Sequence, residues 1–259
     1  MLNNMVFLDI DQRGVGTIVI NRPKVYNAYN GELLEALARA VDTAVNDKNV
    51  RVIKIQGEGK NFQAGADINC LKSIASLSFE ENRSFSALST YTMKKLNECE
   101  KPLVVLVNGG CFGGGMGIVA AADIAIAEEN AEFAISDARW GLVAGPILPQ
   151  LVAAIGPQNT RRYALTAESF GVKRALEIGL IHHICPVGAL KKAVLPILDL
   201  LLKAGPNALK ETKRLIFDVT GISINEETAD WIIHQNATQR QSSEASEGFA
   251  SFLRRREPR

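Results

Sequence analysis

Two glycine-rich segments, each placed between an apolar run and the start of a helical pattern, constrain the fold more than any other feature. Residues 57–68 read GEGKNFQAGADI and follow the strand-like run 52–56 (VIKIQ). Residues 108–117 read NGGCFGGGMG and follow 103–107 (LVVLV), which is apolar at every position. A fully apolar strand is typical of a parallel sheet that is covered on both faces. We therefore expect an α/β fold with both loops at the carboxyl edge of the sheet, where such folds bind ligands.

The remaining pattern indicates one α/β core followed by a helical region. The predicted elements are strands over 6–10, 15–20, 52–56, 103–107 and 124–127, and helices over 31–46, 79–99 and 114–121. From residue 149 onward the pattern is almost wholly helical. We expect an α/β core over residues 1–200 and a C-terminal helical region over 201–259. A helical tail without its own core favours packing on a neighbouring subunit, so we also expect an oligomer.

Composition excludes several classes of protein. The chain has 259 residues, of which 47% are hydrophobic and 22% charged, and 29 basic residues balance 28 acidic ones. This near-neutral charge argues against a nucleic-acid partner. No apolar run reaches the ~18 residues of a membrane span, and the first residues do not resemble a secretory signal. The four cysteines are far apart and have no nearby histidine pattern. We expect a cytoplasmic protein with reduced thiols and without a metal site or a membrane partner.

The two loops also predict a kind of chemistry. Glycine lets the backbone approach a ligand closely, and a helix N-terminus offers unpaired N–H donors. Two such ends that face each other would form a two-donor oxyanion hole. A single loop would be interpreted as a tight turn, and residues 115–120 (GMGIVA) match only a loose dinucleotide fingerprint. That match begins several residues after its strand and lacks a well-placed acidic residue, so we prefer the oxyanion hole.

Five segments are shared with one known family. They are 21–28 (NRPKVYNA), 62–68 (FQAGADI), 101–117 (KPLVVLVNGGCFGGGMG), 131–141 (AEFAISDARWG) and 247–256 (EGFASFLRRR). Together they resemble the enoyl-CoA hydratase/isomerase (crotonase) superfamily over nearly the whole chain. The resemblance implies a spiral of ββα units with a C-terminal helical region, assembled as a homotrimer or a dimer of trimers. It also implies an acyl-CoA thioester substrate, with coenzyme A as part of the substrate and no separate cofactor.

The resemblance assigns expected roles to individual residues. The two backbone N–H groups that would hold the thioester oxygen belong to Ala66 and Gly114, in agreement with the interpretation of the loops. Positions that would line coenzyme A match Lys24, Val25, Ala64, Asp67, Ile68, Phe252 and Arg255. The last two lie in the C-terminal helix, which in this family often reaches a neighbouring subunit.

The sequence departs from the family pattern at the acids. Typical hydratases use two glutamates, whereas the matching positions here are Gly117 and Asp137. Asp137 is the expected catalytic acid, although an aspartate in a turn is also a common structural cap. One carboxylate is enough for a 3-enoyl-CoA to 2-enoyl-CoA isomerase, and a catalytically weak acyl-CoA-binding homologue is a further alternative.

The segments 113–117, 141–149, 154–156 and 161–168 resemble methylglutaconyl-CoA and isohexenylglutaconyl-CoA hydratases. We therefore expect a hydratase for a short or branched 2-enoyl-CoA, with 3-methylglutaconyl-CoA of leucine degradation as one candidate. Arg139 is a candidate for binding a distal carboxylate, with an exposed structural arginine as the alternative. The region 72–90 and the surroundings of Trp140 are expected to determine acyl-chain specificity.

Overall fold

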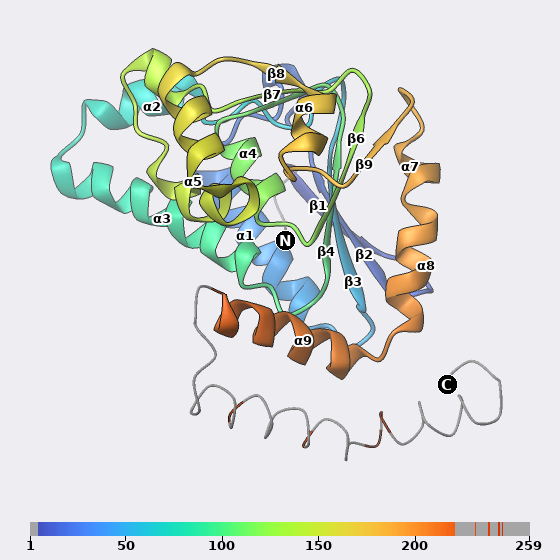
Figure 1. The fold of residues 1–259 in the computed structure, drawn as a ribbon. Helices are drawn as coiled ribbons and strands as arrows, with labels where there is room; N and C mark the ends of the chain where they lie inside the picture. The colour runs from blue at the N-terminus through green and yellow to red at the C-terminus, as the bar shows by residue number, and fades with distance from the viewer. Residues whose placement is uncertain (1–4, 221–230, 232–237, 239–242, 244, 246–259) are drawn as a thin grey trace.

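A six-stranded sheet forms the centre of the molecule in the computed structural model, which describes residues 5–220, 231, 238, 243 and 245 (Figure 1). Its strands are β1 (Val6–Ile10), β2 (Val15–Ile20), β3 (Val52–Gly57), β4 (Leu103–Val107), β6 (Ile124–Glu128) and β9 (His183–Cys185). They lie in the order β1-β2-β3-β4-β6-β9, with β1 antiparallel to β2 and all other pairs parallel. The predicted α/β class is confirmed.

A second, smaller sheet alternates with the first along the chain. It contains β5 (Gly110–Phe112), β7 (Glu132–Ala134) and β8 (Phe170–Gly171), in that order. The chain leaves β4 of the large sheet, enters β5, forms helix α4 (Gly114–Ala120) and returns to the large sheet through β6. The second glycine-rich segment, residues 108–117, therefore contains strand β5 of the small sheet and the start of α4.

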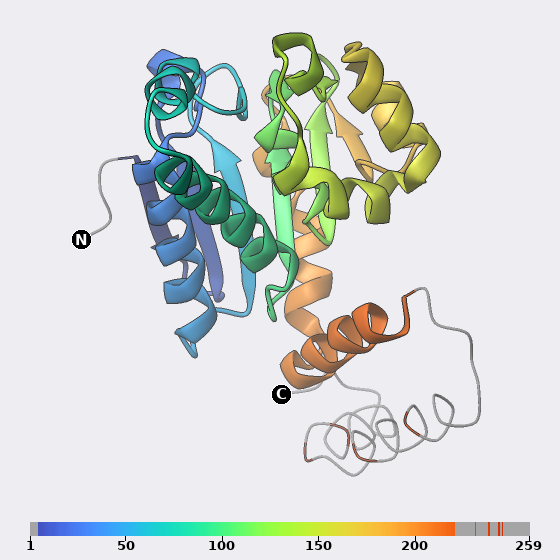
Figure 2. The ribbon, with the colours of Figure 1, turned by 90° about the vertical axis from the view of Figure 1, so that its left-hand side faces the viewer.

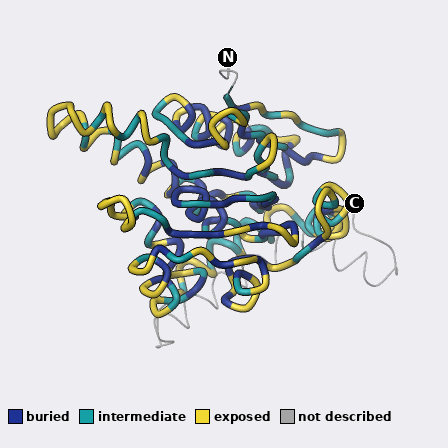
Figure 3. Tube along the Cα trace, turned by 90° about the horizontal axis from the view of Figure 1, so that it is seen from above, coloured by how far each residue is buried: buried dark blue, intermediate teal, exposed yellow. Residues whose placement is uncertain are grey.

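Helices cover both faces of the large sheet. Helices α1 (Gly31–Asn46) and α3 (Phe79–Asn97) lie on one face, and α7 (Leu190–Ala193) and α8 (Leu195–Lys203) lie on the other (Figure 1). Strand β4 is buried at all five positions. Val105 packs into the cluster beneath α1 and α3, whereas Val104 and Leu106 pack into the cluster beneath α8. Figure 3 shows this buried centre between exposed outer helices.

The prediction that the chain is almost wholly helical after residue 149 is wrong in two places. The helices α5 (Leu148–Thr166), α6 (Val172–Glu177) and α9 (Pro206–Val219) are present, but β8 and β9 interrupt the series. These strands have two and three residues, too few to show a period of two against helical surroundings. They exist because they pair with β7 and β6. The division at residue 200, which lies within α8, stays a prediction.

Helix α9 lies beyond the amino ends of the strands (Figure 2). It has no buried residue. Lys213 of α9 donates a 2.7 Å hydrogen bond to Asp123, whose carboxylate also accepts from the Leu103 N–H at the start of β4. The glycine-rich loops lie at the carboxyl ends of the strands. Helix α9 is therefore at the opposite end of the sheet from these loops.

Candidate active site

The two glycine-rich loops are in direct contact. A Cβ atom at Gly113 would lie 3.4 Å from the Cα atom of Gly65, which is van der Waals contact. Both glycines have a positive φ, 90° at Gly65 and 49° at Gly113, which residues with a side chain rarely adopt. The loops are also joined through the backbone, because the Phe112 N–H donates to the Gln63 carbonyl at 2.9 Å. The predicted meeting of the two loops is therefore present in the structure.

Hydrogen bonds hold the backbone on both sides of Ala66. The Gln63 amide donates to the Gly65 carbonyl at 3.0 Å and accepts from the Gly65 N–H at 2.8 Å. Tyr29 donates its N–H to the Gly65 carbonyl at 2.9 Å and accepts from the Asp67 N–H at 2.8 Å. Among the described residues, the Ala66 N–H has no partner. This donor is fixed in direction and available to a ligand.

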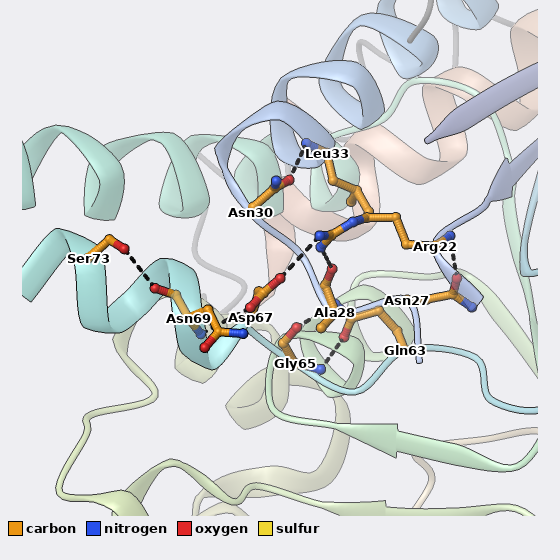
Figure 4. Close-up of polar contacts among 10 residues, drawn as sticks. All are labelled: Arg22, Asn27, Ala28, Asn30, Leu33, Gln63, Gly65, Asp67, Asn69 and Ser73. Atoms are coloured by element: carbon orange, nitrogen blue, oxygen red, sulfur yellow. Dashed lines mark hydrogen bonds and ion pairs between the residues drawn. The ribbon is translucent and has the colours of Figure 1, made fainter. Parts of the chain in front are cut away.

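The segment 21–28 supports the first loop. The Arg22 guanidinium forms an ion pair with Asp67 at 3.1 Å and donates to the Ala28 carbonyl (Figure 4). Asp67 also caps helix α2 (Ile68–Ala75) by accepting from the Asn69 N–H. The carboxylate of Asp67, a predicted coenzyme A contact, is thus engaged in holding the loop.

Asn27 supports the same loop from beneath. Its side chain is fully buried, at 0% exposure, and its amide donates to the backbone carbonyls of Glu58 and Asn61. Its carbonyl accepts from the Arg22 N–H at 2.7 Å. A buried amide with these partners rigidifies the loop, because each lost bond would leave a desolvated polar group.

Gly114 begins helix α4 and offers the second predicted donor. The Gly113 N–H is used by the Ala134 carbonyl at 3.0 Å, whereas the Gly114 N–H has no partner in the described part of the chain. A Cβ atom at Gly114 would lie 2.3 Å from Cε1 of Tyr29, so the tyrosine ring packs directly on this backbone. Ala66 follows Gly65, and Gly114 follows Gly113. Because these two glycines are in contact, the structure brings the two predicted donors together.

Asp137 lies beside the same pair of loops. It is the first residue of the 3-10 helix η2 (Asp137–Trp140), and its Oδ2 atom lies 3.5 Å from where a Cβ of Gly113 would be. This oxygen is buried and has no hydrogen-bond partner among the described residues. Burial raises the pKa of the Asp137 carboxyl, although a hydrogen bond from its own backbone N–H acts in the opposite direction. The predicted acid is placed next to the predicted donors.

Gly117 is enclosed by apolar side chains. A Cβ atom there would lie 2.2 Å from Cγ2 of Ile147 and 3.2 Å from the sulfur of Met93. Ile147 is the last residue of the 3-10 helix η3 (Gly145–Ile147). The position that matches the first glutamate of typical hydratases is therefore filled by Ile147, and no carboxylate fits there without moving η3.

The other predicted coenzyme A contacts differ in exposure and in backbone bonding. Lys24 and Val25 are exposed in the 3-10 helix η1 (Pro23–Val25), and Ile68 is exposed at the start of α2. The Ala64 N–H is used by the Tyr26 carbonyl at 3.0 Å. Phe252 and Arg255 lie outside the described residues.

Two residues proposed for acyl specificity lie on η2. Arg139 is exposed, and its guanidinium donates to the Ala167 carbonyl at 3.3 Å. Trp140 is 67% exposed. Over the described residues, no group of acidic, histidine and cysteine side chains is arranged to hold a metal ion, and no helix is long and apolar enough to span a membrane.

Tyr29 was missed by the sequence analysis. It is half-buried, and its hydroxyl makes no hydrogen bond with another described residue. Partial burial, the Asp137 carboxylate and Cys70 together raise the pKa of Tyr29 to about 12. The only sequence signal for Tyr29 was its position directly after the segment 21–28. The contact of its ring with Gly114 could not be predicted, because the two residues are far apart in the chain.

The chain is similar to proteins of one family. A family model described as enoyl-CoA hydratase/isomerase matches residues 11–259. A putative enoyl-CoA hydratase from Thermus thermophilus is 28% identical, with 97% of this chain and 99% of that protein covered. A mitochondrial Delta(3,5)-Delta(2,4)-dienoyl-CoA isomerase from Dictyostelium discoideum is 26% identical, with 96% and 88% covered. The crystal structure of an enoyl-CoA hydratase from Shewanella pealeana superposes with a TM-score of 0.95 at 31% identity, over 99% of this chain and 96% of that one.

Proposed function

The chain belongs to the enoyl-CoA hydratase/isomerase family and is an enzyme, and from this premise we propose that it adds water reversibly to a short or branched 2-enoyl-CoA. One observation carries the proposal. The unpartnered carboxylate oxygen of Asp137 lies against the junction of the two loops that present the free N–H groups of Ala66 and Gly114.

The two N–H groups would polarise the thioester. When water attacks carbon 3 of an enoyl thioester, negative charge develops on the thioester oxygen. Donors that are already fixed stabilise this charge without reorganisation, and the loss of one such donor costs about 3–4 kcal/mol. Ala66 and Gly114 would fill this role because neighbouring backbone bonds fix both of their loops.

Asp137 would carry the proton. Its carboxylate takes one proton from the water as the oxygen–carbon 3 bond forms, and the same proton is then delivered to carbon 2 of the enolate. Because burial raises the pKa of this carboxyl, both the accepting and the donating form are easier to reach near neutral pH. One carboxylate can therefore carry out both proton transfers, and the reaction needs no second acid at position 117.

The substrate class is inferred from the family and from the rim of the site. Coenzyme A would lie over the exposed residues of η1 and the start of α2, which include the predicted contacts Lys24, Val25, Ala64, Asp67 and Ile68, and would extend to Phe252 and Arg255. We propose no separate cofactor. The resemblance of 113–117 and 141–149 favours a methylglutaconyl-CoA-like substrate, with Arg139 near its distal carboxylate. A homotrimer or a dimer of trimers in the cytoplasm remains part of this proposal.

An isomerase is the second candidate, favoured by the single carboxylate at the loop junction and by the relative named as a dienoyl-CoA isomerase. A single base can remove a proton at carbon 2 and return it at carbon 4. A catalytically weak acyl-CoA-binding protein is the third candidate.

Steady-state assays separate the three candidates. Crotonyl-CoA and 3-methylglutaconyl-CoA are followed by loss of the enoyl-thioester absorbance, with wild type and Asp137→Asn. Rapid water addition that the substitution reduces by 10²-fold or more supports the hydratase. Turnover of a 3-enoyl-CoA without water addition supports the isomerase, and tight thioester binding without either reaction supports the third candidate.

A further inference from the structure

Tyr29 contacts both halves of the candidate oxyanion hole. Its backbone brackets Ala66, because it donates to Gly65 at 2.9 Å and accepts from Asp67 at 2.8 Å. Its ring lies against Gly114, where a Cβ atom would be 2.3 Å from Cε1 and 3.2 Å from Cζ, the carbon that carries the hydroxyl. The Cδ1–Cε1 edge of the ring therefore packs on the start of α4, with Cδ1 at 3.1 Å, and Cζ brings the hydroxyl close to the second donor.

Two polar groups at this junction lack partners among the described residues. They are the Tyr29 hydroxyl and the Oδ2 atom of Asp137. They lie against consecutive residues, since Asp137 contacts Gly113 and Tyr29 contacts Gly114. The Asp137 carboxylate is one of the groups that raise the pKa of Tyr29 to about 12, which also indicates that the two side chains are near each other. Two such groups beside a thioester site are suited to hold one small polar molecule between them.

We propose that Tyr29 is a catalytic residue whose hydroxyl holds the reacting oxygen at carbon 3 of the substrate, opposite Asp137. The inference rests on the proposed hydratase function. In water addition, the oxygen of the water bonds to carbon 3, Asp137 removes one proton from it, and Asp137 returns that proton to carbon 2. Tyr29 keeps its own proton and donates a hydrogen bond to the oxygen throughout. In the reverse direction the same hydrogen bond stabilises the hydroxyl group as it leaves.

The protonation state of Tyr29 agrees with this role. A phenol with a pKa of about 12 stays protonated at neutral pH, so it acts as a donor and not as a base. Packing against Gly114 requires only the ring, and a phenylalanine would satisfy it. The hydroxyl therefore has no structural task among the described residues, and Tyr29→Phe removes the chemical group while it preserves the packing.

Two reactions distinguish Tyr29 from Asp137. Water addition to crotonyl-CoA requires both groups, whereas exchange of the carbon 2 protons of butyryl-CoA in D2O requires only the oxyanion donors and Asp137. We expect Tyr29→Phe to lower the kcat of water addition about 100-fold, with KM changed less than about threefold and with exchange close to wild type. Asp137→Asn should lose both reactions. Tyr91→Phe, the same chemical change at an exposed position of α3, is the matched control and should retain both.

The outcomes are separable. Retained exchange in Tyr29→Phe also shows that the loops remain assembled, so a loss of water addition cannot come from misfolding. Water addition by Tyr29→Phe at the wild-type rate would overturn the inference and leave the proposed function intact. An equal loss of exchange would also overturn it, since Tyr29 would then act by positioning the donors. A wild type that adds no water to any enoyl-CoA would overturn the proposed function, and the role of Tyr29 with it.

Discussion

Asp137 shows how one position can be unfavourable for the folded state and useful for chemistry. Its buried Oδ2 atom has no partner among the described residues, and its negative charge is stabilised less than in water. A structural aspartate in a turn would be expected to cap a nearby N–H with both oxygens available to solvent or backbone. The orphaned oxygen beside Gly113 instead favours a group that awaits a ligand.

The raised pKa of Asp137 predicts the shape of the pH profile. The base form is required for water addition, so kcat/KM should fall as the pH decreases through the pKa of this carboxyl. Because burial raises that pKa, the midpoint should lie above the usual aspartate value of 3.8. Tyr29, the titratable side chain identified beside it, has a pKa of about 12 and therefore produces no acidic limb. The profile is measured with crotonyl-CoA from pH 4 to 9.

The residual activity of Asp137→Asn provides the control for this profile. It should show no acidic limb above pH 4, because the titrating group has been removed. An acidic limb that persists with the same midpoint in Asp137→Asn would assign the titration to another group.

At the scale of elements, α4 and η3 are fitted to each other through Gly117 and Ile147. Gly117→Ala places a methyl group 2.2 Å from Cγ2 of Ile147, in a fully packed region, and should destabilise the protein by about 1–3 kcal/mol. Ile147→Ala removes the nearest clashing atom, Cγ2, and leaves only Cβ at 2.9 Å, so Gly117→Ala should cost about 1 kcal/mol less in that background. Urea unfolding of the four proteins of this cycle measures the coupling.

Additive effects of the two substitutions on the free energy of unfolding would contradict the contact between α4 and η3.

The packing of Ile147 against Gly117 also has a functional consequence. Gly117→Glu should not create a two-acid hydratase, because its side chain has to displace Ile147 before its carboxylate can reach the site.

The sequence predicts long elements well and short ones poorly. Helix α1 has the predicted bounds 31–46, because its apolar face repeats over four turns and Asn30 caps its start. Strand β4 has the predicted bounds 103–107. Helix α2 and the strands β8 and β9 were not predicted, since their limits are set by pairing or by a cap rather than by periodicity.

The site follows the same rule. Ala66, Gly114 and Asp137 could be singled out because motifs surround them, and the structure places them together. Their roles stay predictions. Tyr29 and Ile147 could not be found this way, because their importance lies in contacts with Gly114 and Gly117, which are distant in sequence.

At the scale of the whole molecule, two ion pairs link α9 to the α3–β4 and α4–β6 connections. Lys213, with a side chain 11% exposed, bonds to Asp123 at 2.7 Å, while the pair Lys210–Glu100 at 2.8 Å is largely exposed. Lys213→Met should lower the opening free energy of residues 206–219 by about 1–3 kcal/mol, because it breaks a charge-assisted bond shielded from water. Hydrogen exchange of the α9 amides measures this change.

Lys210→Met is the matched control in the same helix. It should change the opening free energy by less than about 0.5 kcal/mol, since exposed ion pairs contribute little. Equal protection in both variants would mean that Lys213 does not hold α9 against the sheet.

The order of strands in the large sheet has a consequence for the chain during its synthesis. From β1 to β9, each new strand of this sheet pairs with the strand of the same sheet that was made just before it. A ribosome releases about 5–20 residues per second, so the sheet can grow at one edge as the chain emerges and need not wait for a distant partner. A nascent chain then exposes a single unpaired growing edge at a time, which limits its opportunity to pair with a neighbouring nascent chain.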